Sequence, residues 1–310
     1  MNPPAIRCEG LCRWYGEVQG VSGITLEIGP GVAGLLGPNG SGKSTFMRLV
    51  TGLIRPHRGW VEVFGVRMDG PHRHEVFRRV GYAPGEDVHF ESERACDFLR
   101  TLALLGGATP AQAGALVEGA LNRVALLDRA ATRLSEMSKG MRQRIKVAQA
   151  LLFEPELLLL DEPLNGMDPV SRRATLDLVR EWSAAGRTVV FASHVLHEVE
   201  AVTDRMVLLH RARLLAEGRL SEIRELVDTR PRRVRVEGEG LPRLAAAALA
   251  DGVASGVSTG EDGAVRLETH NLPELLLRLR EHGAAGGVRG LEVDDADLET
   301  LFAMLLEEGA

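Results

Sequence analysis

The feature that most constrains the fold of this chain is a glycine-rich segment at residues 37–44. It reads Gly-Pro-Asn-Gly-Ser-Gly-Lys-Ser and matches the pattern G-x-x-x-x-G-K-S at every fixed position. A short apolar run at residues 32–36 precedes it, and residues 43–53 carry apolar side chains at helical spacing. A strand, a glycine loop and a helix in this order predict a phosphate-binding loop in an α/β fold, rather than an ordinary glycine turn before a helix.

The residue types in this segment suit a nucleotide triphosphate and its metal ion. Glycines let consecutive backbone N–H groups turn inward around phosphate oxygens, and the N-terminus of the following helix adds a partial positive charge. Lys43 is expected to reach the β- and γ-phosphates, and the Ser44 hydroxyl is a hard oxygen ligand for Mg²⁺. We expect these residues to contact the nucleotide: Gly37, Pro38, Asn39, Gly40, Ser41, Gly42, Lys43, Ser44 and Thr45.

An acidic motif supplies the other half of such a site. Leucines at residues 157–160 predict a buried parallel strand, and Asp161 and Glu162 follow at its carboxyl end, where open α/β sheets bind ligands. Asp161 is expected to hold Mg²⁺ through a water, and Glu162 to polarise the attacking water as a general base. A solvated acidic turn is the simpler interpretation, but the phosphate loop disfavours it. The sequence therefore predicts ATP and Mg²⁺ as cofactors, with Lys43 and Glu162 as catalytic residues.

Two further side chains have weaker support from their positions alone. His194 ends a predicted strand at residues 188–193, where it can hydrogen-bond the γ-phosphate and the attacking water, although a strand-end histidine is commonly structural. We include it among the catalytic candidates. Tyr15 can stack on adenine, although a core aromatic is the commoner outcome.

Length, charge and cysteine content limit the class of protein. The 310 residues suffice for one large domain and a smaller one, and the net charge of −6 argues against a broad nucleic-acid-binding face. No apolar run approaches the roughly 20 residues that span a bilayer, so a membrane role requires another chain. Cys8, Cys12 and Cys96 show no metal or redox spacing and are expected to be reduced thiols of a cytosolic protein.

The pattern of elements predicts a mostly parallel sheet covered on both faces by helices. Residues 90–134 are rich in Ala and Leu, and we expect an inserted helical subdomain at about residues 89–150, with Ser138 as the cap of its last helix. Asp168 is expected to cap the helix after the acidic strand. The inward face of that helix is predicted to hold Val170, Ala174, Leu178 and Trp182.

Composition changes after Gly218, so we predict an ATP-binding domain at residues 1–218 and a small α+β domain at residues 219–310. The second domain shows strand and helix patterns in the order β-α-β-β-α-β, followed by a final helix at residues 298–306. Its helix at residues 272–279 is expected to place Leu272, Leu276, Leu277 and Leu279 in the core.

These motifs, taken in order, resemble the ATP-binding subunit of an ABC transporter. The resemblance rests on the phosphate loop, the acidic strand, His194 and the sequence Ser-Lys-Gly-Met-Arg-Gln-Arg at residues 138–144, and it covers about residues 5–218. The form of residues 138–144 and the appended domain are similar to the exporter-type branch, whose ATPase subunits pair with separate multi-span permeases. The resemblance implies a P-loop NTPase core that powers export of an unidentified substrate from the cytoplasmic face of the cell membrane.

The resemblance also implies a homodimer with two ATP molecules at its interface. Each ATP would lie on the phosphate loop of one subunit and be closed by the signature segment of the other, which is Met137 to Met141 here, with Ser138, Lys139, Gly140 and Met141 as the contacting residues. The loop ending at Asp168 would communicate across the dimer, although Asp168 also reads as a plain helix cap. Tyr15 falls where the family stacks adenine.

One position departs from the family pattern. The family usually carries a glutamine after the strand at residues 80–84, as a ligand for Mg²⁺ and water that is coupled to the permease. This chain has Gly85 there, followed by Glu86. Either Glu86 substitutes for the glutamine by a shift in register, or a water completes the metal shell.

Two other functions compete with the exporter subunit. A soluble ABC-type ATPase acting on nucleic acid or the ribosome is disfavoured, because such proteins generally carry two ATPase units or a long coiled-coil insertion. A regulatory subunit with poor hydrolysis is suggested by Gly85, while Lys43, Asp161, Glu162 and His194 argue against it. The transported substrate would be set by the permease and does not follow from this sequence.

Overall fold

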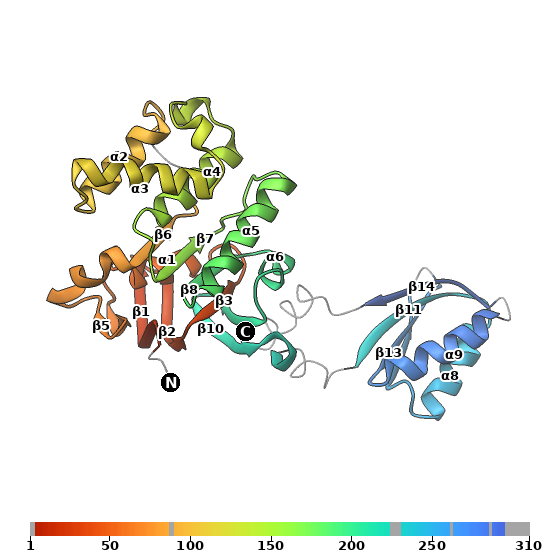
Figure 1. The fold of residues 1–310 in the computed structure, drawn as a ribbon. Helices are drawn as coiled ribbons and strands as arrows, with labels where there is room; N and C mark the ends of the chain where they lie inside the picture. Colours follow the sequence, from red (N-terminus) through yellow and green to blue (C-terminus); the bar gives the residue numbers. More distant parts are fainter. Residues whose placement is uncertain (1–3, 87–89, 224–230, 261–262, 285–286, 295–310) are drawn as a thin grey trace. The chain divides into compact units, whose positions relative to one another are not determined.

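The computed structural model describes residues 4–86, 90–223, 231–260, 263–284 and 287–294, and its elements are drawn in Figure 1. The chain divides into two compact units, Met1–Arg219 and Leu220–Ala310. The first unit contains all of the predicted nucleotide-site residues. Each unit has a hydrophobic core of its own, so the two are described separately.

A six-stranded sheet forms the centre of the first unit. Its strands are β3 (Gly31–Leu36), β6 (Val80–Ala83), β7 (Leu157–Asp161), β8 (Thr188–Ser193), β9 (Arg205–His210) and β10 (Arg213–Arg219). They lie in the order β10-β9-β3-β8-β7-β6, and every neighbouring pair is parallel except β10 with β9. The predicted mostly parallel sheet of an α/β fold is thereby confirmed.

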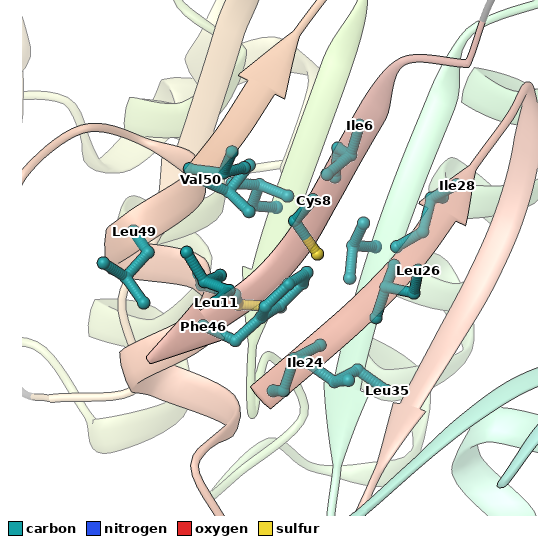
Figure 2. Close-up of a cluster of buried hydrophobic side chains, with 14 of the residues drawn as sticks. Ile6, Cys8, Leu11, Ile24, Leu26, Ile28, Leu35, Phe46, Leu49 and Val50 are labelled. Atoms are coloured by element: carbon teal, nitrogen blue, oxygen red, sulfur yellow. The ribbon is translucent and has the colours of Figure 1, made fainter. Parts of the chain in front are cut away.

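A second, antiparallel sheet packs over the first, with helix α1 (Lys43–Val50) in contact with both. Its strands are β1 (Ile6–Tyr15), β2 (Val18–Ile28), β4 (Arg58–Val63) and β5 (Val66–Arg67), in the order β2-β1-β4-β5. Figure 2 shows side chains of β1, β2, β3 and α1 meeting in the apolar core between these elements. The expected helix at residues 43–53 is shorter than predicted, and Leu53 is exposed.

Helices α5 (Pro169–Ala184) and α6 (Leu196–Glu200) contact β3 and β8 on the other face of the parallel sheet. Successive residues of a strand point to opposite faces, and β3 illustrates this arrangement. Leu35 joins the core beside α1, whereas a Cβ added at Gly34 would lie 2.0 Å from Val199 of α6. A glycine at position 34 therefore allows α6 to approach the sheet closely.

The predicted inward face of α5 is wrong by about one residue. Val170 is 79% exposed and Ala174 is exposed, although Trp182 is buried as predicted. The buried residues of this helix are Ser171, Thr175, Val179 and Trp182. The first turn is oriented by Asp168, whose carboxylate accepts hydrogen bonds from the Ser171 N–H and hydroxyl, so a polar residue occupies the inward position. Apolar spacing alone did not reveal this polar contact.

The inserted segment is helical, as expected. It contains α2 (Ala95–Leu105), α3 (Pro110–Arg123), two short 3₁₀ turns (Leu127–Arg129 and Leu134–Glu136) and α4 (Lys139–Leu151). Thr109 and Gln112 form a reciprocal capping box at the start of α3, and Ser138 caps α4. A longer 3₁₀ segment, η1 (Pro71–Arg79), leads into β6. None of the helices in the described part of the chain is both long and apolar enough to cross a membrane.

The second unit is a small α+β fold. Its elements are β11 (Arg232–Gly238), α8 (Leu241–Ala250), β12 (Gly256–Thr259), β13 (Val265–Thr269), α9 (Leu272–Ala284) and β14 (Val288–Asp294), in the order β-α-β-β-α-β. The strands pair antiparallel in the order β12-β13-β11-β14. Leu279 is buried as expected, but Leu277 is 50% exposed, because Leu275 occupies the inward position. The predicted helix at residues 298–306 lies outside the described residues.

Candidate active site

The candidate site lies where three adjacent strands end. Strands β3, β8 and β7 are neighbours in the sheet and run parallel, so their carboxyl ends share one edge. The glycine loop at residues 37–42 follows β3, His194 follows β8, and Asp161 and Glu162 close β7. The topology therefore brings together three segments, of which the first, the glycine loop, and the last, His194, are more than a hundred residues apart in the sequence.

Lys43 begins α1 and turns back toward its own loop. Its Nζ donates to the Gly37 backbone oxygen at 2.6 Å and to the Pro38 backbone oxygen at 3.2 Å. The first bond of α1 runs from the Phe46 N–H to the Gly42 oxygen, so the preceding N–H groups of this helix have no acceptor within it. These groups form the positive end of the helix, where the glycine loop joins it.

Gly42 requires the absence of a side chain for two reasons. Its φ of 107° lies in the left-handed region, and an added Cβ would lie 2.4 Å from the Gly20 backbone oxygen. Gly40 also has a positive φ, of 80°. The loop therefore holds a backbone conformation that other residues adopt only with strain, as the motif predicted.

Glu162 contacts both other parts of the site. Its Oε1 lies 3.4 Å from Lys43 Nζ, and its Oε2 lies 2.8 Å from Nδ1 of His194. The backbone of Glu162 has a φ of 49°, a left-handed conformation that is uncommon for a glutamate. Two hydrogen bonds hold it there: its N–H donates to Ala192, and its backbone oxygen accepts from Gln143 Nε2 at 2.9 Å. Such strain in a non-glycine residue concentrates at functional sites.

Asp161 is almost completely buried, at 1% exposure. Within the residues that the structure describes, Asp161 Oδ1, Glu162 Oε1 and Ser41 Oγ are buried without a hydrogen-bond partner. Burial and the negative charge of Asp161 raise the pKa of Tyr82, on the neighbouring strand β6, to about 12. Unsatisfied buried oxygens are costly, and Asp161 Oδ1 and Ser41 Oγ, which have no ion pair among the described residues either, therefore indicate a binding site.

Gly85 lies beside Asp161, and an added Cβ would lie 3.4 Å from Asp161 Oδ2. The neighbouring Glu86 does not replace the missing glutamine here. Its carboxylate pairs with the Arg48 guanidinium of α1, and its side chain is 70% exposed. The hydrogen bond that Arg48 donates to the Glu86 carboxylate also raises the pKa of Arg48. Of the two sequence-based interpretations, the register shift of Glu86 therefore has no support from the geometry.

Tyr15 ends β1 and is 42% exposed, so it is not a core aromatic. A Cβ added at Gly20 would lie 2.8 Å from the Tyr15 ring and 2.9 Å from Thr45 Cγ2, so both residues flank the same glycine. The guanidinium of Arg13 lies 5.3 Å from the ring centroid. The ring thus lies next to the far end of the phosphate loop, with part of its surface open.

The signature segment contacts the loop after β7. Ser138 caps α4 by accepting a hydrogen bond from the Met141 N–H at 3.2 Å, and Lys139 Nζ donates to the Asn165 side chain at 3.3 Å. Asp168 caps α5, and the hydrogen bonds from Ser171 lower the pKa of its carboxyl group. For Ser138 and Asp168 the structure thus shows the capping contact directly.

Known proteins are similar to this chain in sequence and in fold. A family model described as ABC transporter matches residues 21–165. The Nod factor export ATP-binding protein I of Paraburkholderia xenovorans is 34% identical over 220 residues, which are 70% of this chain and 72% of that protein. The bacitracin transport ATP-binding protein of Enterococcus faecalis is 30% identical over 308 residues, which are 98% of this chain and 97% of that protein. This chain belongs to the ABC transporter ATP-binding proteins.

Solved structures agree with this assignment. The structure of an ATP-binding subunit of an ABC transporter matches with a TM-score of 0.64 at 30% identity and covers 72% of this chain and 93% of that one. A dimeric bacterial ABC transporter cassette matches with a TM-score of 0.63 at 20% identity over 69% of this chain and 98% of its own. Cassettes of this family hydrolyse ATP, so this ABC protein is an ATPase.

Sequence reasoning missed several residues that surround the site of this ABC protein. Gln143 donates a hydrogen bond to the backbone oxygen of Glu162. Lys146 donates to the backbone oxygen of Glu86, and Arg48 pairs with the Glu86 carboxylate. The signal for Gln143 was its place in the signature-bearing helix, and Lys146 stood out because lysine occurs at only three positions, Lys43, Lys139 and Lys146. Their partners follow only from the fold.

Proposed function

We propose that this protein is the ATP-binding and ATP-hydrolysing subunit of an ABC exporter, with Lys43 and Glu162 in the catalytic site. The observation that carries the proposal is the convergence of Lys43, Glu162 and His194 at the ends of β3, β7 and β8. Motif residues from three separate segments form one network of contacts. If the glycine segment and the acidic segment were only structural turns, contact between their side chains would not be expected.

The residues of the site fit a magnesium-bound triphosphate. The glycine loop and the positive end of α1 would supply N–H groups that bind phosphate oxygens. The buried Asp161 Oδ1 and the Ser44 hydroxyl would hold Mg²⁺, which prefers hard oxygen ligands. The ion would supply charge neutralisation at the phosphates. The remaining contacts of the loop, from residues 37 to 45, would orient the triphosphate.

Hydrolysis would be performed by the carboxylate of Glu162, which would accept a proton from the attacking water. His194 Nδ1 lies 2.8 Å from this carboxylate and would orient it and the terminal phosphate. Lys43 Nζ lies 3.4 Å from the Glu162 carboxylate. It would stabilise the negative charge that develops on the phosphate oxygens. Tyr15 would stack on the adenine beside Thr45.

We propose that a groove in the first unit is the contact site for a membrane permease. It has a volume of about 370 Å³ and is lined mostly by apolar side chains. Its lining includes Leu53, Phe77, Tyr82, Leu102, Phe153 and Pro155. Leu53 is 66% and Phe77 46% exposed, although both are large and apolar. Exposed apolar surface in a groove is typical of a partner site.

The export direction and the dimer rest on the relatives. Their printed names include Nod factor export, linearmycin resistance and bacitracin transport, and one of the similar solved cassettes is dimeric. We infer that two copies of this chain pair with a separate multi-span permease on the cytoplasmic face of the membrane. Ser138, Lys139, Gly140 and Met141 of one copy would then close over the ATP of the other, with Asp168 nearby.

The test is a mild-detergent pull-down of the tagged Glu162→Gln protein from its native host, with the co-purifying chains identified. Slow hydrolysis is expected to retain the ATP-bound dimer, together with a stoichiometric multi-span protein that lacks its own ATPase. The matched control combines Glu162→Gln with Leu53→Asp, which places a charge in the exposed groove and is expected to lose that chain. Recovery of only soluble partners or nucleic acid would contradict the exporter function.

A further inference from the structure

Lys146 is the one lysine of this chain that the nucleotide-site motifs do not contain. It lies in α4, and only 2% of its surface is exposed, so it is among the largest fully buried side chains of the described residues. Burying an ammonium group costs several kcal/mol unless hydrogen bonds compensate it. An apolar side chain would fill the same volume without that cost. The position therefore calls for an explanation beyond packing.

Two of the groups that the Lys146 ammonium contacts belong to the segment after β6. Its Nζ donates to the Glu86 backbone oxygen at 2.8 Å and to the Gly85 backbone oxygen at 3.2 Å. Hydrogen bonds from a charged donor are roughly twice as strong as neutral ones. The ammonium therefore fixes the path of two consecutive residues that belong to no helix or strand.

The segment that Lys146 holds lies directly against the acidic end of β7. A Cβ added at Gly85 would lie 3.4 Å from the Asp161 carboxylate, so the backbone at this position runs close beside it. A glycine has no side chain whose contacts could fix its position. The position of the Gly85 backbone beside Asp161 therefore depends on contacts to its carbonyl group, and Lys146 makes one of them.

Lys146 is flanked on α4 by two glutamines at a spacing of three residues, which places all three side chains on one side of the helix. Gln143 donates to the Glu162 backbone oxygen at 2.9 Å, and Gln149 donates to the Tyr82 backbone oxygen at 3.4 Å. Helix α4 is thus joined by polar side chains to the carboxyl ends of both β7 and β6. Lys146 is the charged member of this row.

We propose that Lys146 is a positioning residue that holds the Gly85–Glu86 backbone against Asp161 and so supports hydrolysis, in place of a side chain at position 85. The inference rests on the proposed role of Asp161 in the site. It assigns no contact between Lys146 and the nucleotide. Helix α4 is capped by Ser138 and lines the groove through Gln149 and Ala150, so a displacement of α4 would reach Gly85 through Lys146.

The test compares Lys146→Met, which keeps the length and removes the charge, with Lys146→Arg, which keeps a charged donor. For Lys146→Met we expect kcat to fall about 10- to 100-fold, as for displaced catalytic geometry, while ATP affinity without metal stays within about twofold. Amide hydrogen exchange of the nucleotide-free protein should rise in residues 80–86 and stay unchanged elsewhere in the first unit. Lys146→Arg should restore most of kcat.

Two results would overturn the positioning role. One is a Lys146→Met protein whose kcat stays within about twofold of the wild type, since displacement of the catalytic groups is expected to lower kcat by more than about twofold. The other is a uniform rise of exchange across the first unit with a lower melting temperature, which indicates a structural role alone. Asp161→Asn separates the two proposals: if it leaves hydrolysis intact, the proposed role of Asp161 fails, whatever Lys146 does.

Discussion

At the scale of single residues, the proposed chemistry depends on Lys43 and Glu162, whose side chains form an ion pair, and on the buried Asp161. Lys43, Asp161 and Glu162 lie in motifs whose spacing is set by the phosphate loop and by the end of a buried strand, so their sequence context was sufficient. Gln143 and Lys146 were not predictable as partners of the site. Each bonds a backbone oxygen between 19 and 61 residues away, and such pairs depend on how helix α4 packs against the sheet.

Tyr15 provides a test at the scale of one side chain. Tyr15→Ala should weaken ATP binding about 5- to 150-fold, because stacking of a base on an aromatic ring contributes roughly 1–3 kcal/mol. Tyr15→Phe keeps the ring and should bind ATP as the wild type does. Affinities measured by equilibrium dialysis should show no change for inorganic triphosphate, which has no base. Equal ATP affinity in Tyr15→Ala and the wild type would show that the adenine lies elsewhere.

At the scale of elements, the sequence predicted which helices and strands form and in what order, but it predicted less well which face of a helix is buried. The inserted helices, the parallel strands and the β-α-β-β-α-β order of the second unit follow from composition and periodicity. The face of α5 was misassigned because Asp168 bonds Ser171 and turns a polar residue inward. The end of α1 was misplaced because apolar spacing continues to Leu53, which lies in the exposed groove.

A matched pair of valines in α5 tests the corrected face. Val179 is fully buried, whereas Val170 is 79% exposed. Val179→Ala should lower the free energy of unfolding by about 2 kcal/mol, since it removes two buried carbon groups and leaves a small cavity. Val170→Ala should leave it unchanged. Urea denaturation monitored by circular dichroism measures both, and equal losses in the two variants would contradict the assigned face.

At the scale of the whole molecule, the chain combines two units with separate cores. The candidate site, the groove and the signature segment all belong to the first unit, and the second contributes a sheet with α8 and α9 packed on it. The boundary predicted at residue 218 lies beside the one between Arg219 and Leu220. The role of the second unit did not follow from its sequence, because it carries no catalytic motif.

Removal of the second unit tests this division. A protein of residues 1–219 should unfold cooperatively and retain ATP hydrolysis within a few-fold of the full chain, because none of the proposed site residues is removed. Hydrolysis and a thermal melt of both proteins are the measurements. A fragment that is soluble and folded but cannot bind ATP would show that the second unit completes the site.

The measurement that tests the central claim most directly is steady-state ATP hydrolysis by the purified wild-type protein and by Glu162→Gln at saturating Mg-ATP. We predict turnover by the wild type and a loss of at least about 100-fold in Glu162→Gln, because the amide cannot accept a proton from water. Glu181→Gln, at an exposed position of α5, is the matched control and should behave as the wild type. Equal turnover in Glu162→Gln and the wild type, or no turnover in the wild type, would contradict the account.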